Sequence, residues 1–176
     1  MGFAQTALGP TGPDAPAIHR AIWHQSLFGA IASAGFGLLF NFGWATVALA
    51  AASGALALAV RTMGLDAGWS LAAASFAAAA AVGIGIRLLE LPPVRLNYAG
   101  NALAVTGCIP MVPGSAAAQG IMGLLGLTAQ VPVHAGQTLL VAVEYGLRVV
   151  FTIGAIGAGL TIVTALLRHP HFRSPD

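Results

Sequence analysis

Long apolar blocks separated by short polar turns make up most of this chain. Blocks of this length approach the roughly 20 apolar residues that a helix needs to cross a bilayer, and each therefore predicts a membrane span. The pattern predicts five spans, at residues 26–42, 45–60, 69–89, 97–127 and 138–167. The first two are short for a full crossing, so an alternative interpretation is one tilted helical hairpin that turns at residues 41–44.

The fourth block is broken at Ile109–Ser115, where the sequence reads Ile-Pro-Met-Val-Pro-Gly-Ser. Each proline lacks a backbone donor and clashes with the preceding turn, so an α-helix cannot continue through this segment. Inside a membrane, broken backbone is tolerated only where protein or a water-filled cavity satisfies its polar groups. Transporters often build their substrate sites from such broken helices. The break makes transport the leading hypothesis, with a proline kink that only shapes packing as the alternative.

The composition leads to the same class of protein. Only 7% of the 176 residues are charged and 57% are hydrophobic, whereas a soluble domain carries about 25% charged residues. This number of charged residues is too small to cover a water-facing surface. We therefore expect an all-α integral membrane protein embedded in a lipid bilayer. Residues 1–25 are expected to form a flexible N-terminal tail, residues 26–168 the transmembrane helical domain, and residues 169–176 a C-terminal tail.

The seven basic residues are all arginines, and their positions are expected mainly to report topology. In a five-span chain Arg20 and Arg61 share one side of the membrane, and the other side holds four arginines. The positive-inside rule assigns the richer side to the cytoplasm, which predicts a cytoplasmic C-terminus in a bacterial inner membrane. Scattered arginines do not make the basic face that nucleic-acid binding requires, so no nucleic-acid partner is expected.

No enzyme signature is present in the sequence. There is no HExxH motif, and no nucleophile has a base at a recognisable spacing. Cys108 is the only cysteine, so a cysteine-based metal site is excluded. We therefore expect neither catalysis nor a bound metal or cofactor.

Several short motifs occur in a characteristic order. Along the chain they are Phe40-Asn41, Arg61 with Gly64, Trp69-Ser70, the run Val-Gly-Ile-Gly-Ile-Arg at residues 82–87, and the broken segment at residues 109–115. Together they resemble the membrane half-domain of the threonine/serine exporter family, in its small stand-alone form. The resemblance covers about residues 33–127.

The resemblance implies a solute class and a partner. Members of that family export threonine and serine, and some two-subunit members export succinate. By resemblance, this chain is the smaller, C-terminal-like half and works with a larger homologous membrane subunit. A homo-oligomer is the other possible assembly. The chain departs from the family at Glu144 and Arg148, which match no motif of the family pattern.

The break itself supplies the candidate substrate-binding residues Pro110, Pro113, Gly114 and Ser115. If two half-helices meet there, the second points its N-terminal N–H groups and partial positive charge into the membrane interior. Ser115 or Gly114 is expected to cap that helix. A carboxylate is favoured at such a helix start, and amino acids and dicarboxylates both carry one.

Two further sets of polar residues are candidates. Asn97 and Asn101 lie on one helical face and either line the solute path or cap the helix start. Glu144 and Arg148 form an i,i+4 pair of opposite charge in the last span. They either lie at the headgroup level or, if buried, provide a proton-coupling carboxylate and its counter-ion or a carboxylate clamp.

These observations predict a subunit of a secondary transporter that exports small carboxylate-bearing metabolites. Threonine and serine are the first candidates and succinate-like dicarboxylates the next, with the proton motive force as the suspected driving force. The alternative is a non-transporting scaffold or assembly subunit of another transporter or channel. A passive scaffold has no need of broken backbone inside the membrane, so substitutions in the break distinguish the two hypotheses.

Overall fold

The computed structural model describes residues 15–90, 100–129 and 135–167, and every regular element in these ranges is helical. The elements are α1 (Ala15–Leu39), α2 (Trp44–Asp66), α3 (Leu71–Glu90), α4 (Gly100–Cys108), the 3-10 helix η1 (Ile109–Met111), α5 (Gly114–Ala129) and α6 (Ala135–Leu166). The all-α prediction is confirmed for these residues. α1 begins at Ala15, inside the stretch 1–25 that was expected to form a flexible tail.

Three helices, α2, α3 and α6, are long and apolar enough to cross a membrane. α4, η1 and α5 add a fourth candidate, a helix pair bent by 58° at the break. α1 is not among these candidates, because polar residues such as His24 and Gln25 lower the hydropathy of its first half. The described residues thus contain three or four candidate spans where the hydropathy pattern predicts five, and the interruption of the fourth is confirmed.

α1 and α2 form a helical hairpin, and α2 is long and apolar enough to be a candidate span of its own. The chain reverses at Asn41, whose φ of 57° lies in the left-handed region that asparagine tolerates. The N–H of Phe42 donates to the carbonyl of Gly37 at 2.9 Å and closes the end of α1. Gly29 and Gly54 let the helices touch, since a Cβ on either one would collide with the backbone of the other.

α4, the half-helix before the break, packs against α2 and α3. The hydroxyl of Ser33 in α1 donates to the backbone oxygen of Thr106 in α4, 3.1 Å away. Gly107 faces Ser53 of α2 so closely that any side chain there would collide with it. Close helix packing through small residues is typical of membrane interiors, where packing rather than hydrophobicity drives association. The surrounding buried core contains Ala50, Ala57, Ala78, Ala79, Leu103 and Met111.

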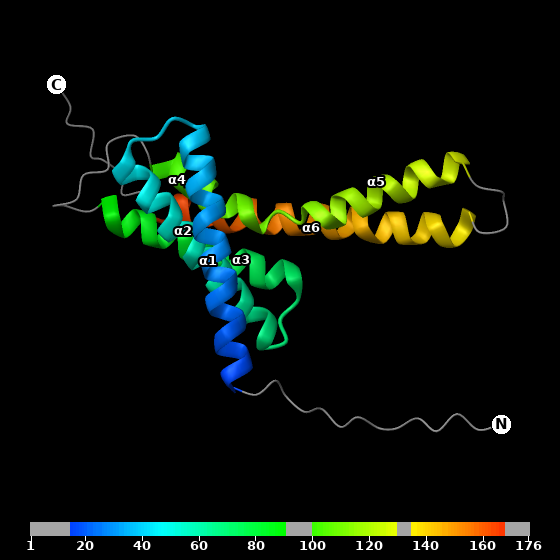
Figure 1. Ribbon diagram of the computed structural model, residues 1–176, viewed down its shortest axis with the longest axis horizontal. Coiled ribbons are helices and arrows are strands. Elements are labelled where there is room, and N and C mark those ends of the chain that lie inside the picture. Colours follow the sequence, from blue (N-terminus) through cyan, green and yellow to red (C-terminus); the bar gives the residue numbers. More distant parts are fainter. Residues whose placement is uncertain (1–14, 91–99, 130–134, 168–176) are drawn as a thin grey trace.

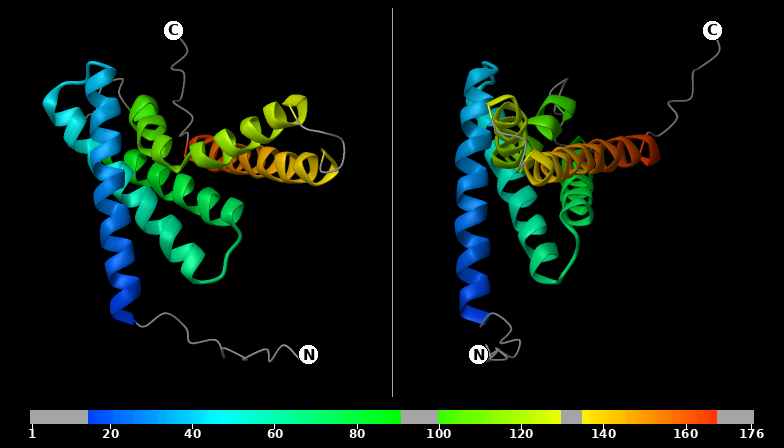
Figure 2. Two further views of the ribbon diagram at one scale, coloured as in Figure 1. Left: turned by 45° about the vertical axis from the view of Figure 1, so that its right-hand side comes forward. Right: turned by 90° about the vertical axis from the view of Figure 1, so that its right-hand side faces the viewer.

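α5 and α6 form a second hairpin that extends away from the other helices, and α6 crosses the direction of α1 (Figure 1). The same arrangement is clear from two other directions (Figure 2). α6 has 32 residues, so it is roughly 48 Å long. Its C-terminal half packs on α3, where Gly159 contacts the backbone of Phe76 and Gly83 lies against Val163. This docking fixes the rest of α6 beside the break.

Candidate functional site

The break is a short, well-defined backbone structure. η1 ends where the N–H of Val112 donates to the carbonyl of Ile109 at 3.0 Å. Val112 then adopts an extended conformation, with φ of −63° and ψ of 126°, because the following proline disfavours helical backbone at this position. α5 opens with a bond of 3.0 Å from the N–H of Ala117 to the carbonyl of Pro113. Pro113 therefore holds the cap position that was expected for Ser115 or Gly114.

Arg61 ties α2 to this break. Its Nη1 donates a hydrogen bond to the backbone oxygen of Met111 at 3.2 Å. A helix end leaves carbonyl groups without partners, and Arg61 satisfies one of them at a residue whose side chain is completely buried. Arg61 is a half-buried residue inside α2, so it has a structural contact in addition to the topological role expected from the sequence, which stays a prediction. The reason for the contact is tertiary: the α2–η1 contact brings an orphan acceptor to the guanidinium.

A cavity of about 560 Å³ opens at the break. This volume lies within the range of about 300–1,000 Å³ that is typical of small-molecule sites. Residues from four elements and the break segment line it: Arg61, Leu71, Pro110, Val112, Pro113, Gly114, Ser115, Ala116, Gln119, Tyr145 and Arg148. α2, the break, the start of α5 and the middle of α6 therefore share one polar space.

The lining of this cavity is electropositive. Arg61 and Arg148 carry the charged groups, and among the described residues no Asp or Glu lines the cavity. The two guanidinium groups repel each other. The Nε of Arg61 is buried and has no hydrogen-bond partner in the described part of the chain. An unmatched buried donor is costly, but Nε is enclosed and not exposed to the cavity. The two lining arginines, with no lining carboxylate among the described residues, give the cavity an excess of positive charge that suits an anion.

The start of α5 adds polar groups to the same space. Ser115 and Ala116 lie in the first helical turn, where the helix supplies no acceptor for backbone N–H groups. Both residues line the cavity, as does Gln119, one turn further along α5. The partial positive charge of a helix N-terminus favours a carboxylate or phosphate. The start of α5 and the two arginines therefore both favour the binding of an anion in this cavity.

Small residues position α6 against α5. A Cβ on Gly120 would lie 3.5 Å from the Cβ of Tyr145, and one on Gly123 would lie 3.0 Å from the Cβ of Ala142. This close approach places Tyr145 and Arg148 beside the first turns of α5. Gly120 and Gly123 thus allow α6 to approach α5 closely enough to form one wall of the cavity.

The structure brings together five of the eight residues expected in the site, namely Pro110, Pro113, Gly114, Ser115 and Arg148. Glu144 and Arg148 are both exposed on α6, so the pair is not buried within the described part of the chain, and Glu144 does not line the cavity. Asn101 lies in the first turn of α4, with a side chain outside the described part of the structure, and Asn97 lies outside the described residues altogether.

Sequence reasoning missed Arg61, Gln119 and Tyr145 as lining residues. Helical spacing contained a signal for two of them, since Gln119 follows Ser115 by four residues and Tyr145 precedes Arg148 by three. No local pattern places Arg61 there, because its contact joins residues 50 positions apart.

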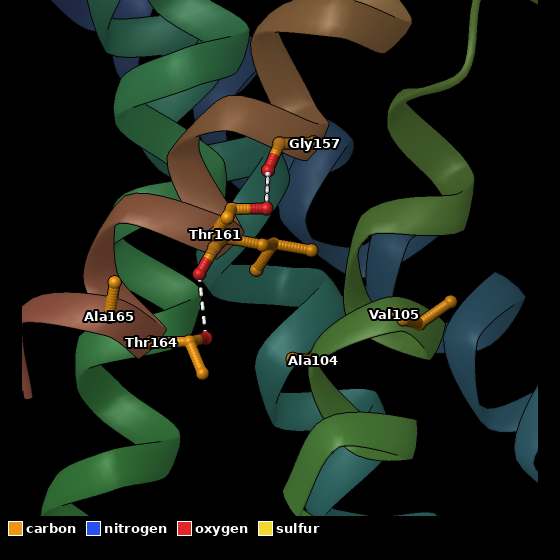
Figure 3. A pocket seen from close by; sticks show the side chains of 7 residues that line it. Ala104, Val105, Gly157, Thr161, Thr164 and Ala165 are labelled. Atoms are coloured by element: carbon orange, nitrogen blue, oxygen red, sulfur yellow. Dashed lines mark hydrogen bonds between the residues drawn. The ribbon is translucent and has the colours of Figure 1, made fainter. Parts of the chain in front are cut away.

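A second cavity, of about 590 Å³, lies between α4 and α6 and has a different chemistry. Its lining is uncharged and mostly apolar, with Ala104, Val105 and Gly157 among the residues shown in Figure 3. The hydroxyl of Thr161 donates to the carbonyl of Gly157 in its own helix, at 2.8 Å. This cavity offers no charge to a carboxylate, so the cavity at the break is the better candidate for an anionic solute.

The described residues offer no metal centre, since no three His, Cys, Asp or Glu side chains gather within residues 15–90, 100–129 and 135–167.

Among known families, the one described as "Threonine/Serine exporter, ThrE" matches residues 25–166. No curated protein and no solved structure matches the chain. The family match covers most of the chain, including every residue that lines the cavity at the break. This chain therefore belongs to the threonine/serine exporter family, a family of membrane transporters.

Proposed function

We propose that this chain is a subunit of a secondary transporter that exports small carboxylate-bearing metabolites, and that the cavity at the break is its solute site. One observation carries the proposal: Arg148 and the N-terminal turn of α5 line the same cavity. A guanidinium group and a helix start both bind carboxylates. Threonine and serine are the first solutes to test because the family is named after them, and succinate-like dicarboxylates are the second.

The broken span also suggests how the solute moves. Backbone at a break is held by few helical bonds, and here one of its carbonyls depends on Arg61. We expect alternating access to the site to proceed by movement of α5 and α6 relative to α2 and α4 around residues 109–113.

Proton coupling is assigned to Glu144 in this proposal, on the condition that a partner subunit buries the Glu144–Arg148 pair, which is exposed in the chain by itself. Glu144 lies one helical turn before Arg148 on α6, where a proton on the carboxyl group changes the net charge beside the solute site. Arg148 is then the carboxylate clamp. The driving force is the proton gradient across the bacterial inner membrane, with the C-terminus of the chain in the cytoplasm.

A larger homologous subunit completes the transporter in this proposal. The α5–α6 hairpin supports it, since α5 packs against α6 and lies apart from α1–α4 (Figure 1). Many large apolar side chains of the hairpin are exposed, among them Ile121, Met122, Leu125, Leu140 and Phe151. Helices of a second subunit are expected to cover one face of this hairpin and lipid the other.

The deciding experiment compares efflux from cells loaded with threonine, serine or succinate. It uses the chain alone, the chain with the product of its neighbouring gene, and cells with neither protein. Efflux only with the neighbour supports the two-subunit exporter, and efflux from the chain alone supports a homo-oligomer. No efflux of any of the three solutes, with both proteins present in the membrane, contradicts the proposal and favours the scaffold hypothesis.

A variant links that efflux to the break. Replacing Pro110, Pro113 and Gly114 together by alanine should abolish flux and leave assembly intact, because a continuous helix removes the cavity wall. Gly126→Ala is the matched control, since a Cβ at Gly126 meets no atom within 4 Å. Unchanged flux in the triple variant contradicts the assignment of the site.

A further inference from the structure

We infer that Arg61 is a second solute-binding residue, paired with Arg148, and that together they select solutes with two anionic groups over zwitterionic amino acids. The inference rests on the proposed function and concerns the same cavity. Within the proposed solute class it places short dicarboxylates ahead of threonine and serine. Arg61 becomes the residue that sets this preference.

The first step concerns the donors that Arg61 has available. Nη1 donates to the backbone oxygen of Met111, whereas Nε is enclosed by protein atoms, has no partner among the described residues and is not exposed to the cavity. A guanidinium group has five N–H donors in a fixed planar fork. Arg61 lines the cavity, and one hydrogen bond from Nη1 leaves the remaining N–H groups of its two terminal nitrogens to bind a carboxylate while Arg61 keeps its hold on the break.

The second step concerns the number of charges in the cavity. Arg61 and Arg148 come from α2 and α6 and line the same cavity, and their charges repel each other. A solute with one carboxylate neutralises one guanidinium and leaves the other unpaired in a partly buried site. A solute with two carboxylates neutralises both and removes the repulsion, and each charge-assisted contact is stronger than a neutral hydrogen bond.

The third step concerns the ammonium group of an amino acid. Such a group is neutralised only by an anionic acceptor, and no Asp or Glu of the described residues lines the cavity. The side-chain acceptors that do line it, those of Ser115, Gln119 and Tyr145, are neutral and leave the ammonium charge unbalanced. Glu144, the acidic residue one turn away on α6, is exposed and outside the lining. A zwitterion therefore brings a positive charge into a cavity that already holds two.

Uptake into inverted membrane vesicles tests the inference, because in them an exporter moves solute from the medium to the lumen. Vesicles that carry this chain and its neighbouring gene product are given labelled succinate or labelled threonine. We expect succinate uptake to exceed threonine uptake. Arg61→Gln should lower succinate uptake roughly tenfold to hundredfold, the loss expected for one charged hydrogen bond, and should lower threonine uptake much less.

The ratio of the two rates separates a binding role from a structural one. A variant that merely disturbs the break lowers both rates by the same factor, and that outcome overturns the role of Arg61. Arg61→Lys keeps the charge and should restore part of the succinate preference. Met63→Gln is the control, since Met63 lies on the exposed side of the same helix, two residues away, and its ratio should equal that of the wild type.

A measurement on the wild-type protein alone keeps the inference testable if Arg61→Gln fails to accumulate. Unlabelled succinate should inhibit labelled succinate uptake about tenfold more strongly than succinamate, in which an amide replaces one carboxylate. Equal inhibition overturns the need for two anionic groups. Faster uptake of threonine than of succinate overturns the inference but leaves the proposed function intact, whereas uptake of neither solute overturns both.

Discussion

Ser33 and Thr106, which lie 73 positions apart in the chain, are joined by a buried hydrogen bond of 3.1 Å from the Ser33 hydroxyl to the Thr106 carbonyl. The bond anchors α4, the first half of the broken span, to the α1–α2 hairpin. The second half, α5, packs on α6 instead. The two halves of the broken span therefore have different direct supports, although α6 itself docks on α3.

The first prediction concerns the packing that holds α1 against α2. Gly54→Ala should lower the free energy of unfolding by about 1–3 kcal/mol, as overpacking of a close contact does. A Cβ at Gly54 would overlap the Ser33 hydroxyl and the Gly29 carbonyl. Thermal unfolding in detergent measures the change. Gly35→Ala on α1 is the control, because a Cβ there meets no atom within 4 Å, and equal stability of the two variants would contradict the packing argument.

The second prediction concerns Arg148 as the carboxylate clamp. Arg148→Gln should weaken solute binding by about 1.5–3 kcal/mol, the contribution of a hydrogen bond to a charged group. The apparent KM for uptake into inverted vesicles measures it, at equal amounts of protein in the membrane. Arg148→Lys should retain part of the affinity, because it keeps the charge but loses the bidentate geometry. An unchanged KM in Arg148→Gln would remove this residue from the site.

The third prediction assigns proton coupling to Glu144. Glu144→Gln should leave solute binding in place and make flux insensitive to the proton gradient, because the glutamine side chain cannot take up a proton at this position. Flux is measured with and without a protonophore in both proteins. A wild-type flux that falls on addition of protonophore and a variant flux that falls equally would exclude Glu144 as the coupling residue.

The fourth prediction concerns the spacing of the two walls of the cavity. Gly123→Leu should push α5 from α6, because even a Cβ at this position would lie 3.0 Å from the Cβ of Ala142. Separation of these helices moves Ser115 away from Arg148, so uptake should fall although neither residue is changed. Gly126→Leu, three residues further along α5, faces open space. It should retain wild-type uptake, and equal losses in both variants would point to a general folding defect instead.

Part of this protein is determined by its sequence alone. Hydropathy depends on composition over a window of residues, so the membrane class and the all-α fold follow directly from it. A missing N–H and a steric clash are properties of proline itself, so the break between Pro110 and Pro113 is local and predictable. Arg148, Ser115 and the prolines were found in the same way, because a charge or a helix start in an apolar segment is visible in the sequence.

Only the tertiary structure decided which of these groups share a space. Arg61 reaches the break because α2 packs on η1, and Tyr145 and Arg148 reach it because Gly120 and Gly123 let α6 approach α5. Such contacts depend on how helices dock over their whole length, and small residues permit many dockings of similar energy. A pattern along one chain does not choose among them. The position of Arg61, and with it the charge balance of the site, is therefore a property of the fold.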